Sequence, residues 1–315
     1  MKRILLIFLA AALLLLCAAC GADGQAAEPA GETETQQPEQ SVTEEPDEPS
    51  PAPEESQPDE QAQAAAQAQA EQATAALEED EPELEQEVDP YLICIDAGHQ
   101  EHGSSEREPN GPGSSTMKAR VTGGTRGTTT GLYEYELNLQ VSLKLQEELE
   151  SRGYTVLMVR TENDVDLSNA ERSEIANEAG ADAFVRIHAN GSESSSASGA
   201  MTICMTPSNP YNGALYESSR ALADAVLEGL TAATGAEDDG VWETDTMTGI
   251  NWSEVPVTIV EMGYMTNPEE DRLMASEDYQ WQLARGIADG IDTFFAAQEA
   301  AASGAEDEAA PEAVG

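Results

Sequence analysis

The stretch ICIDAGHQ, residues 93–100, begins apolar, turns polar and ends beside a histidine. Its first three residues are apolar and bulky or β-branched, which favours a buried β-strand. The whole chain has only three histidines, His99, His102 and His188. A histidine directly after a predicted buried strand, in a chain with so few of them, is a candidate functional residue.

Strand and helix patterns alternate from residue 91 to about residue 295. Apolar residues recur every fourth position from Leu137 to Leu149, and Gly153 ends this helical pattern. Ser168 and Glu171 have the spacing of a capping box. Predicted strands cover residues 91–98, 154–160, 181–188, 199–205 and 255–264, and predicted helices cover 135–153, 168–180, 211–235 and 279–295. The alternation predicts a single α/β domain, residues 90–297, with an open, mostly parallel sheet flanked by helices.

Three ionisable residues stand at the carboxyl ends of predicted strands. His99 follows the first strand, His188 ends the strand AFVRIH, and Glu261 ends the segment VTIVE. Ligands bind outside the carboxyl ends of the strands in open parallel α/β sheets. Glu134 opens a helix after a long polar loop and can reach the same edge. We therefore expect these four side chains to lie together.

Two imidazoles and a carboxylate can bind a tetrahedral zinc ion, with a fourth position left open for water or substrate. A further carboxylate is needed to move the proton of the attacking water. Taken singly, each residue has an ordinary alternative. Either histidine can be a hydrogen-bonded structural residue, and Glu134 can be an acid that favours a helix N-terminus. Glu261 is less ordinary, because burying an unpaired carboxylate is unfavourable.

The overall charge excludes nucleic acid as a partner. The chain has 14 Lys and Arg against 61 Asp and Glu, a net charge of -47, so a phosphate backbone would be repelled. This composition favours an extracytoplasmic role with neutral or cationic partners. Four cysteines are too few for a fold built on disulfides. Cys94 and Cys204 lie in predicted strands and are expected to be buried thiols.

Both ends of the chain are predicted to lie outside the folded domain. Residues 1–20 resemble a bacterial lipoprotein signal, with the lipid attached to Cys20. Cys17 stands where leucine is usual, and simple secretion or an uncleaved anchor are the alternatives. Residues 21–89 contain no Lys or Arg and are predicted to be a disordered acidic tether. Residues 298–315 are predicted to be a disordered acidic tail.

Several motifs together resemble those of the zinc-dependent N-acetylmuramoyl-L-alanine amidases, the amidase_3 class of peptidoglycan hydrolases. The resemblance follows the order of the motifs along nearly the whole stretch from residue 91 to residue 295. It rests on IDAGH at 95–99, YEYELNL at 133–139, Arg172 with Ala176 and Asn177, IHAN at 187–190, and VPVTIVEMGYMTN at 255–267.

The resemblance implies both a fold and a reaction. The zinc ligands would be His99, Glu134 (in preference to Glu136) and His188, and Glu261 would be the catalytic acid and base. The reaction would hydrolyse the amide between N-acetylmuramic acid and L-alanine of the stem peptide. The implied fold is an open six-stranded α/β sheet.

Two residues depart from the family pattern. Gln100 stands where glycine is usual, and we expect it to narrow the approach to the metal. Arg186 stands where serine is usual. We expect its side chain to lie on the face of the strand opposite His188, near an acidic residue such as Asp182.

Three further residues are candidates for supporting the site. Asp96 is expected either to orient a ligand imidazole or to form a turn. Asn190 is expected to hold its loop or to contact substrate. Arg126 belongs to a basic group in the polar loop that could meet stem-peptide carboxylates or offset neighbouring acids; the others are Arg107, Lys118 and Arg120.

We therefore expect a peptidoglycan amidase attached to a membrane through its N-terminal lipid and acting in or near the cell wall. A zinc peptidase on the same fold and a non-catalytic wall-binding lipoprotein are the alternatives. The latter is disfavoured because no ligand or base is missing. The sequence leaves open whether an unidentified activator is required.

Overall fold

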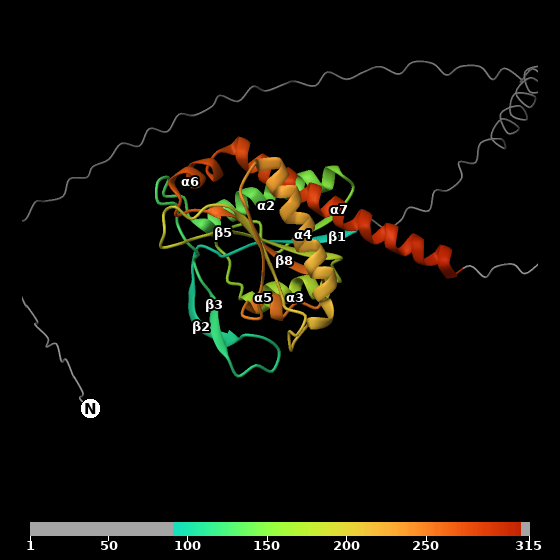
Figure 1. Cartoon of the computed structure of the whole chain (residues 1–315). Coiled ribbons are helices and arrows are strands. Elements are labelled where there is room, and N and C mark those ends of the chain that lie inside the picture. The colour runs from blue at the N-terminus through green and yellow to red at the C-terminus, as the bar shows by residue number, and fades with distance from the viewer. Residues whose placement is uncertain (1–90, 310–315) are drawn as a thin grey trace, which may run out of the picture. The chain divides into compact units, whose positions relative to one another are not determined.

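The computed structural model describes residues 91–309 (Figure 1). The predicted signal, the expected lipid attachment at Cys20 and the predicted tether lie outside the described residues. Within residues 91–309, no helix is both long enough and apolar enough to span a bilayer.

A six-stranded sheet forms the centre of the domain, in the order β4-β1-β5-β8-β6-β7. Its strands are β1 (Leu92–Ala97), β4 (Thr155–Met158), β5 (Ala183–Asn190), β6 (Ala200–Cys204), β7 (Asp238–Glu243) and β8 (Val257–Tyr264). Every neighbouring pair is parallel except β6 and β8, which are antiparallel. The predicted open, mostly parallel six-stranded sheet is confirmed.

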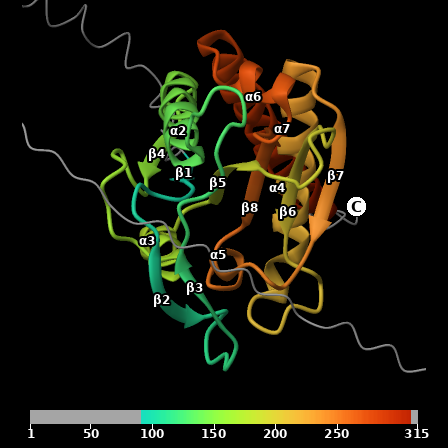
Figure 2. The ribbon, with the colours of Figure 1, turned by 90° about the vertical axis from the view of Figure 1, so that its left-hand side faces the viewer.

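Helices cover both faces of this sheet (Figure 2). One hydrophobic cluster joins the Ile93 and Ile95 face of β1 to three long helices, and a second joins the Cys94 face to shorter ones. The helices are α2 (Glu134–Ser151), α3 (Asn169–Ala179), α4 (Tyr216–Thr234), α5 (Thr248–Asn251), α6 (Pro268–Met274) and α7 (Glu277–Ala309), with a short 3-10 turn at Gly213–Leu215. Cys94 and Cys204 are buried free thiols, as predicted.

The first described residue packs against the last long helix. The ring of Tyr91 stacks on that of Phe295 with 4.0 Å between the centroids, and the Tyr91 hydroxyl donates to Glu299 at 3.3 Å. The start of β1 and α7 are therefore neighbours, at the edge of the sheet opposite the carboxyl ends of the parallel strands.

Several elements differ from the sequence-based expectation, including the short helices α5 and α6, which were not predicted. The predicted polar loop contains an antiparallel hairpin, β2 (Ser104–Pro109) and β3 (Met117–Val121). Its strands are mostly polar and lack an alternating pattern, so the contacts that hold them come from distant residues: Trp252 donates to Pro109 O and Asn169 donates to Arg120 O. The edge strand β7 was not predicted. Helix α7 continues to Ala309, so the prediction of a disordered tail starting at residue 298 was wrong for residues 298–309.

Candidate metal centre and catalytic site

His99, Glu134 and His188 meet at the carboxyl edge of the sheet, where β1, β5 and the start of α2 come together. His99 Nε2 lies 3.1 Å from Glu134 Oε1, and His188 Nδ1 lies 3.3 Å from the same oxygen. One donor atom from each of the three residues lies within 4.8 Å of the others. The two imidazole rings are nearly perpendicular, with their centroids 4.8 Å apart.

The hydrogen bonds of His99 fix which ring nitrogen is free. Its Nδ1 lies 2.9 Å from the carbonyl oxygen of Thr122, which can only accept, so Nδ1 carries the proton. In the neutral ring, Nε2 then presents a lone pair to Glu134. A lone pair and a carboxylate oxygen facing each other at 3.1 Å repel unless a cation or a proton lies between them.

Glu134 is held in place by backbone donors. Thr125 N donates to Oε2 at 2.7 Å and Ala189 N donates to Oε1 at 3.3 Å. Burial favours the protonated form, but the two adjacent imidazoles, His188 and His99, outweigh it and hold the pKa of Glu134 well below its usual range. Burial lowers the pKa of His188 to about 4. At neutral pH the cluster therefore consists of a carboxylate and a neutral His188 imidazole, the forms that bind metals.

The spacing of the donor atoms fits a tetrahedral divalent cation. With bonds of about 2.0–2.2 Å to nitrogen and oxygen, the ligand atoms of a tetrahedral zinc ion lie roughly 3.3–3.5 Å apart. The two measured separations, 3.1 and 3.3 Å, are close to this range. Both separations involve Glu134 Oε1, and the donor atoms of all three residues lie within 4.8 Å of one another, so the ligand types and their proximity suit a divalent cation such as zinc.

Glu261 lines one cavity together with His99 and His188. It is the register partner of His188 across β5 and β8, and both line a cavity of about 320 Å³. Its Oε2 is buried and has no hydrogen-bond partner among the described residues. Burial, with a smaller effect of the Glu134 charge, raises the pKa of Glu261 to about 8. A carboxyl group with this pKa can both accept and donate a proton near neutral pH.

The turn between β1 and the metal cluster requires a small residue. A Cβ on Gly98 would lie 2.2 Å from the Cε1 and Nε2 atoms of His188, so any larger residue would displace that ring. His99 itself has a φ of 61°, the left-handed conformation that is uncommon for a non-glycine residue. This strained backbone conformation therefore needs hydrogen bonds that hold the neighbouring peptide groups in place.

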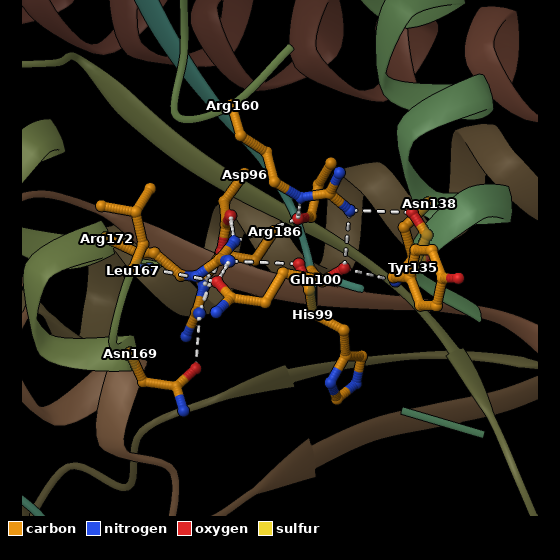
Figure 3. Close-up of polar contacts among 12 residues, drawn as sticks. Asp96, His99, Gln100, Tyr135, Asn138, Arg160, Leu167, Asn169, Arg172 and Arg186 are labelled. Atoms are coloured by element: carbon orange, nitrogen blue, oxygen red, sulfur yellow. Dashed lines mark hydrogen bonds and ion pairs between the residues drawn. The ribbon is translucent and has the colours of Figure 1, made fainter. Parts of the chain in front are cut away.

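Buried arginines supply that support (Figure 3). Arg160 donates to the carbonyl oxygens of Ala97 at 2.7 Å and Gly98 at 3.1 Å, and Arg172 donates to that of His99 at 3.1 Å. These hydrogen bonds fix the carbonyl groups of three consecutive residues, the last of which is His99. Sequence reasoning missed the role of Arg160, although its position at the end of a predicted strand pointed to this edge.

The expectation that Asp96 orients an imidazole or forms a turn was wrong. Its carboxylate accepts from Arg172 Nη1 at 2.6 Å and from Arg186 Nε at 2.9 Å. Asp96 and Arg186 are register partners on β1 and β5, which brings their side chains together. The partner that orients His99 is Thr122, which follows β3, and no local sequence signal identifies it.

Both departures from the family pattern lie elsewhere than expected. Residues two apart on a strand share a face, so Arg186 lies on the His188 side and lines the same cavity; the prediction that it faces away, near Asp182, was wrong. Gln100 does not narrow the approach to the metal ligands. Its buried side chain accepts from Arg172 Nη2 at 2.8 Å and from Leu167 N at 3.1 Å.

The two remaining candidates make local contacts. Asn190 Oδ1 accepts from Gly191 N at 2.8 Å, which favours the loop-holding alternative. Arg126 is exposed, donates to Gly131 O at 2.7 Å and stacks its guanidinium 4.4 Å from the centroid of Tyr133. It does not line the cavity that contains Glu261.

The chain resembles known amidases in both sequence and structure. It is 32% identical to the N-acetylmuramoyl-L-alanine amidase LytC of Bacillus subtilis over 165 residues, which are 52% of this chain and 32% of LytC. It is 26% identical to the N-acetylmuramoyl-L-alanine amidase Rv3717 of Mycobacterium tuberculosis over 213 residues, 66% of this chain and 87% of that protein. The crystal structure of the amidase Ami1 of Mycobacterium smegmatis matches with a TM-score of 0.60 and 25% identity, and the match covers 66% of this chain and 97% of Ami1.

The family model described as N-acetylmuramoyl-L-alanine amidase (Amidase_3) matches residues 93–293, which contain the sheet, the histidine and glutamate cluster and Glu261. This match spans more than half of the chain. The protein therefore belongs to the Amidase_3 family of N-acetylmuramoyl-L-alanine amidases.

Proposed function

We propose that this protein is a zinc-dependent peptidoglycan hydrolase that cleaves the amide between N-acetylmuramic acid and L-alanine of the stem peptide. The proposal rests on one observation above all. His99 and His188, which form a cluster with Glu134, line one cavity with Glu261, inside the region matched by the amidase family.

The residues that would hold zinc are His99 through Nε2, Glu134 through Oε1 and His188 through Nδ1. Bound zinc would supply Lewis-acid polarisation of the substrate carbonyl and would make water more acidic. Thr122 O fixes the His99 tautomer, and the amides of Thr125 and Ala189 fix the Glu134 carboxylate. The protein therefore orients the ligands before the ion binds.

Glu261 would carry the proton in this mechanism. Its carboxylate would accept a proton from the attacking water and pass it to the nitrogen of the leaving L-alanine. A carboxyl of ordinary pKa is a weak base, and burial makes Glu261 a stronger one. Its unpartnered Oε2 leaves an acceptor free for this transfer.

The test is to incubate the full chain with purified peptidoglycan and identify the released ends by mass spectrometry. We expect stem peptides that begin with a free L-alanine amine, with the glycan strands intact. A zinc chelator should abolish their release, and added zinc should restore it, because the ligand set holds a removable ion. Cleavage within the peptide would favour the zinc-peptidase alternative. Binding without cleavage would favour a wall-binding role or the need for an activator.

We also propose that the protein acts outside the cytoplasm and is anchored by a lipid on Cys20. The lipoprotein-like pattern of residues 1–20 and the cell-wall names of the relatives support this. In a bacterial host, the mature N-terminal peptide is expected to begin with a lipid-modified Cys20 and to separate with the membranes. A Cys20→Ser variant should lose that modification. An unmodified Cys20 in the membrane-associated wild-type protein would contradict the proposal.

A further inference from the structure

The cavity beside the metal cluster contains positive charge that the proposed hydrolysis does not use. Arg186 and Lys118 both line the cavity that contains His188 and Glu261. Arg186 lies on β5, two residues before His188, and is only 2% exposed. Lys118 reaches the cavity from β3 and is itself exposed. Two cations at one substrate cavity, in a chain of net charge -47, need an explanation.

Arg186 is only partly neutralised by its protein partners. Asp96 offers one negative charge, and two guanidinium groups share it: Arg172 at 2.6 Å and Arg186 at 2.9 Å. Arg160 is buried close by and contacts only backbone carbonyls and the amide of Asn163. Among the described residues, Asp96 is the one carboxylate that pairs with these guanidinium groups, so a further anion that reached Arg186 would gain a favourable ion pair. The cavity is the open side on which such an anion can approach.

The Arg186 guanidinium is oriented with one nitrogen left free. Nε donates to Asp96, and Nη2 donates to Asn169 Oδ1 at 3.1 Å. Among the described residues, Nη1 has no hydrogen-bond partner. A Cβ on Gly249, which also lines the cavity, would lie 1.3 Å from Nη1. The absence of a side chain at Gly249 thus makes the room that Nη1 occupies at the cavity wall.

The strand register places Arg186 close enough to the reacting groups for one short peptide to reach both. Across the sheet, His188 is paired with Glu261, and Arg186 is paired with Ile259. The Cα atom of Arg186 therefore lies two strand residues, about 7 Å, from that of His188. Consecutive Cα atoms of a peptide are about 3.8 Å apart, so a carboxylate on the residue after L-alanine would lie roughly 6–7 Å from the scissile nitrogen.

We infer that Arg186, with Lys118 on the wall of the same cavity, binds a free carboxylate on the residue that follows L-alanine, and so selects stem peptides that carry an acid rather than a carboxamide there. This inference rests on the proposed amidase function. Arg186 acts here as a specificity-determining residue, because a guanidinium donates to a carboxylate with charge assistance that a neutral amide does not provide.

The test compares two muramoyl peptides that differ only in carboxylate or carboxamide at that residue. The full chain loaded with zinc is expected to have a kcat/KM about 10- to 100-fold higher for the carboxylate form. Arg186→Gln should remove most of this preference, mainly by raising KM for the carboxylate form, and Arg186→Lys should retain part of it. Arg285→Gln, which removes an exposed arginine of α7 outside the cavity, should keep the full preference.

Binding separates this inference from the proposed function. Calorimetric titration of the two cleaved peptides, acid and amide, requires no hydrolysis and should show the same preference in the wild-type chain. If neither substrate is cleaved but the acid binds more tightly, the subsite stands and the proposed reaction fails. Equal binding of the two forms by the wild type overturns the inference, without reliance on any variant. An equal loss of kcat/KM on both substrates in Arg186→Gln also overturns the inference, because it would mean that Arg186 only supports Asp96.

Discussion

Replacing Glu261 with glutamine is expected to lower turnover of peptidoglycan by about 10²- to 10⁴-fold while leaving the bound zinc unchanged. Glutamine has nearly the same size and can occupy the same buried place, but it cannot accept the proton of the attacking water. Glu261 is not one of the three clustered donor residues, so metal content should stay at the wild-type level. Turnover is measured by release of stem peptides, and metal content by elemental analysis of the same samples.

The matched control is Glu136→Gln, two residues from Glu134. Glu136 accepts a hydrogen bond from Tyr133 N at 3.2 Å, which a glutamine oxygen can also accept, and it does not line the cavity. This variant should keep both zinc and activity. It also tests the choice of Glu134 over Glu136 as the ligand. Near-normal turnover in Glu261→Gln would show that another group carries the proton.

Replacing Asp96 with asparagine is expected to destabilise the domain by about 3–5 kcal/mol, because it removes the anion from a buried pair. Arg172 and Arg186 would then lie buried without their shared countercharge. Chemical denaturation in the presence of a chelator measures the unfolding free energy without a contribution from bound metal. Asp166→Asn is the control: Asp166 also pairs with an arginine, Arg120, but its side chain is 80% exposed, so its loss should change stability by less than about 1 kcal/mol.

The contribution of Asp96 to the free energy of unfolding should also depend on pH. Burial alone would raise its pKa, but the charges of Arg172 and Arg186 outweigh burial and hold the pKa of Asp96 well below its usual range. A carboxyl with a depressed folded-state pKa stabilises the fold above its unfolded pKa of about 3.9 and loses that contribution as the pH falls further. The stability gap between wild type and Asp96→Asn should therefore be full near neutral pH and should narrow below about pH 4. A gap independent of pH would contradict the ionic origin.

The sequence predicted the sheet and the four central residues because each depends on a local pattern. Strands end where apolar runs end, and parallel strands bring those ends to one edge, so His99, His188 and Glu261 could be placed together without a structure. The motifs that resemble the amidase family agreed with this placement. The structure brings His99, Glu134 and His188 together at this edge, and Glu261 lines the cavity beside the two histidines.

What the sequence did not predict depends on pairing between distant segments. The β2–β3 hairpin is fixed by residues more than forty positions away, such as Asn169 and Trp252. The partner of Asp96 is set by the β1–β5 register, which no local pattern reveals. For Arg186, the period of two along a strand was sufficient to place it beside His188, and the expectation of the opposite face applied that period incorrectly.

The stacking of Tyr91 on Phe295 places the start of β1 beside α7, so a short connection between these two points would close the chain of the domain into a ring. The six residues of β1 separate this junction from His99 by about 20 Å, so a connection made there stays clear of the cavity. Circular permutation is compatible with such an arrangement. With α7 shortened to end soon after Phe295, a short linker could join it to β1, and new ends could be opened at Gly235, where an added Cβ would meet no atom within 4 Å. We expect the strand order and the cluster of His99, Glu134 and His188 to be the same wherever this ring is cut.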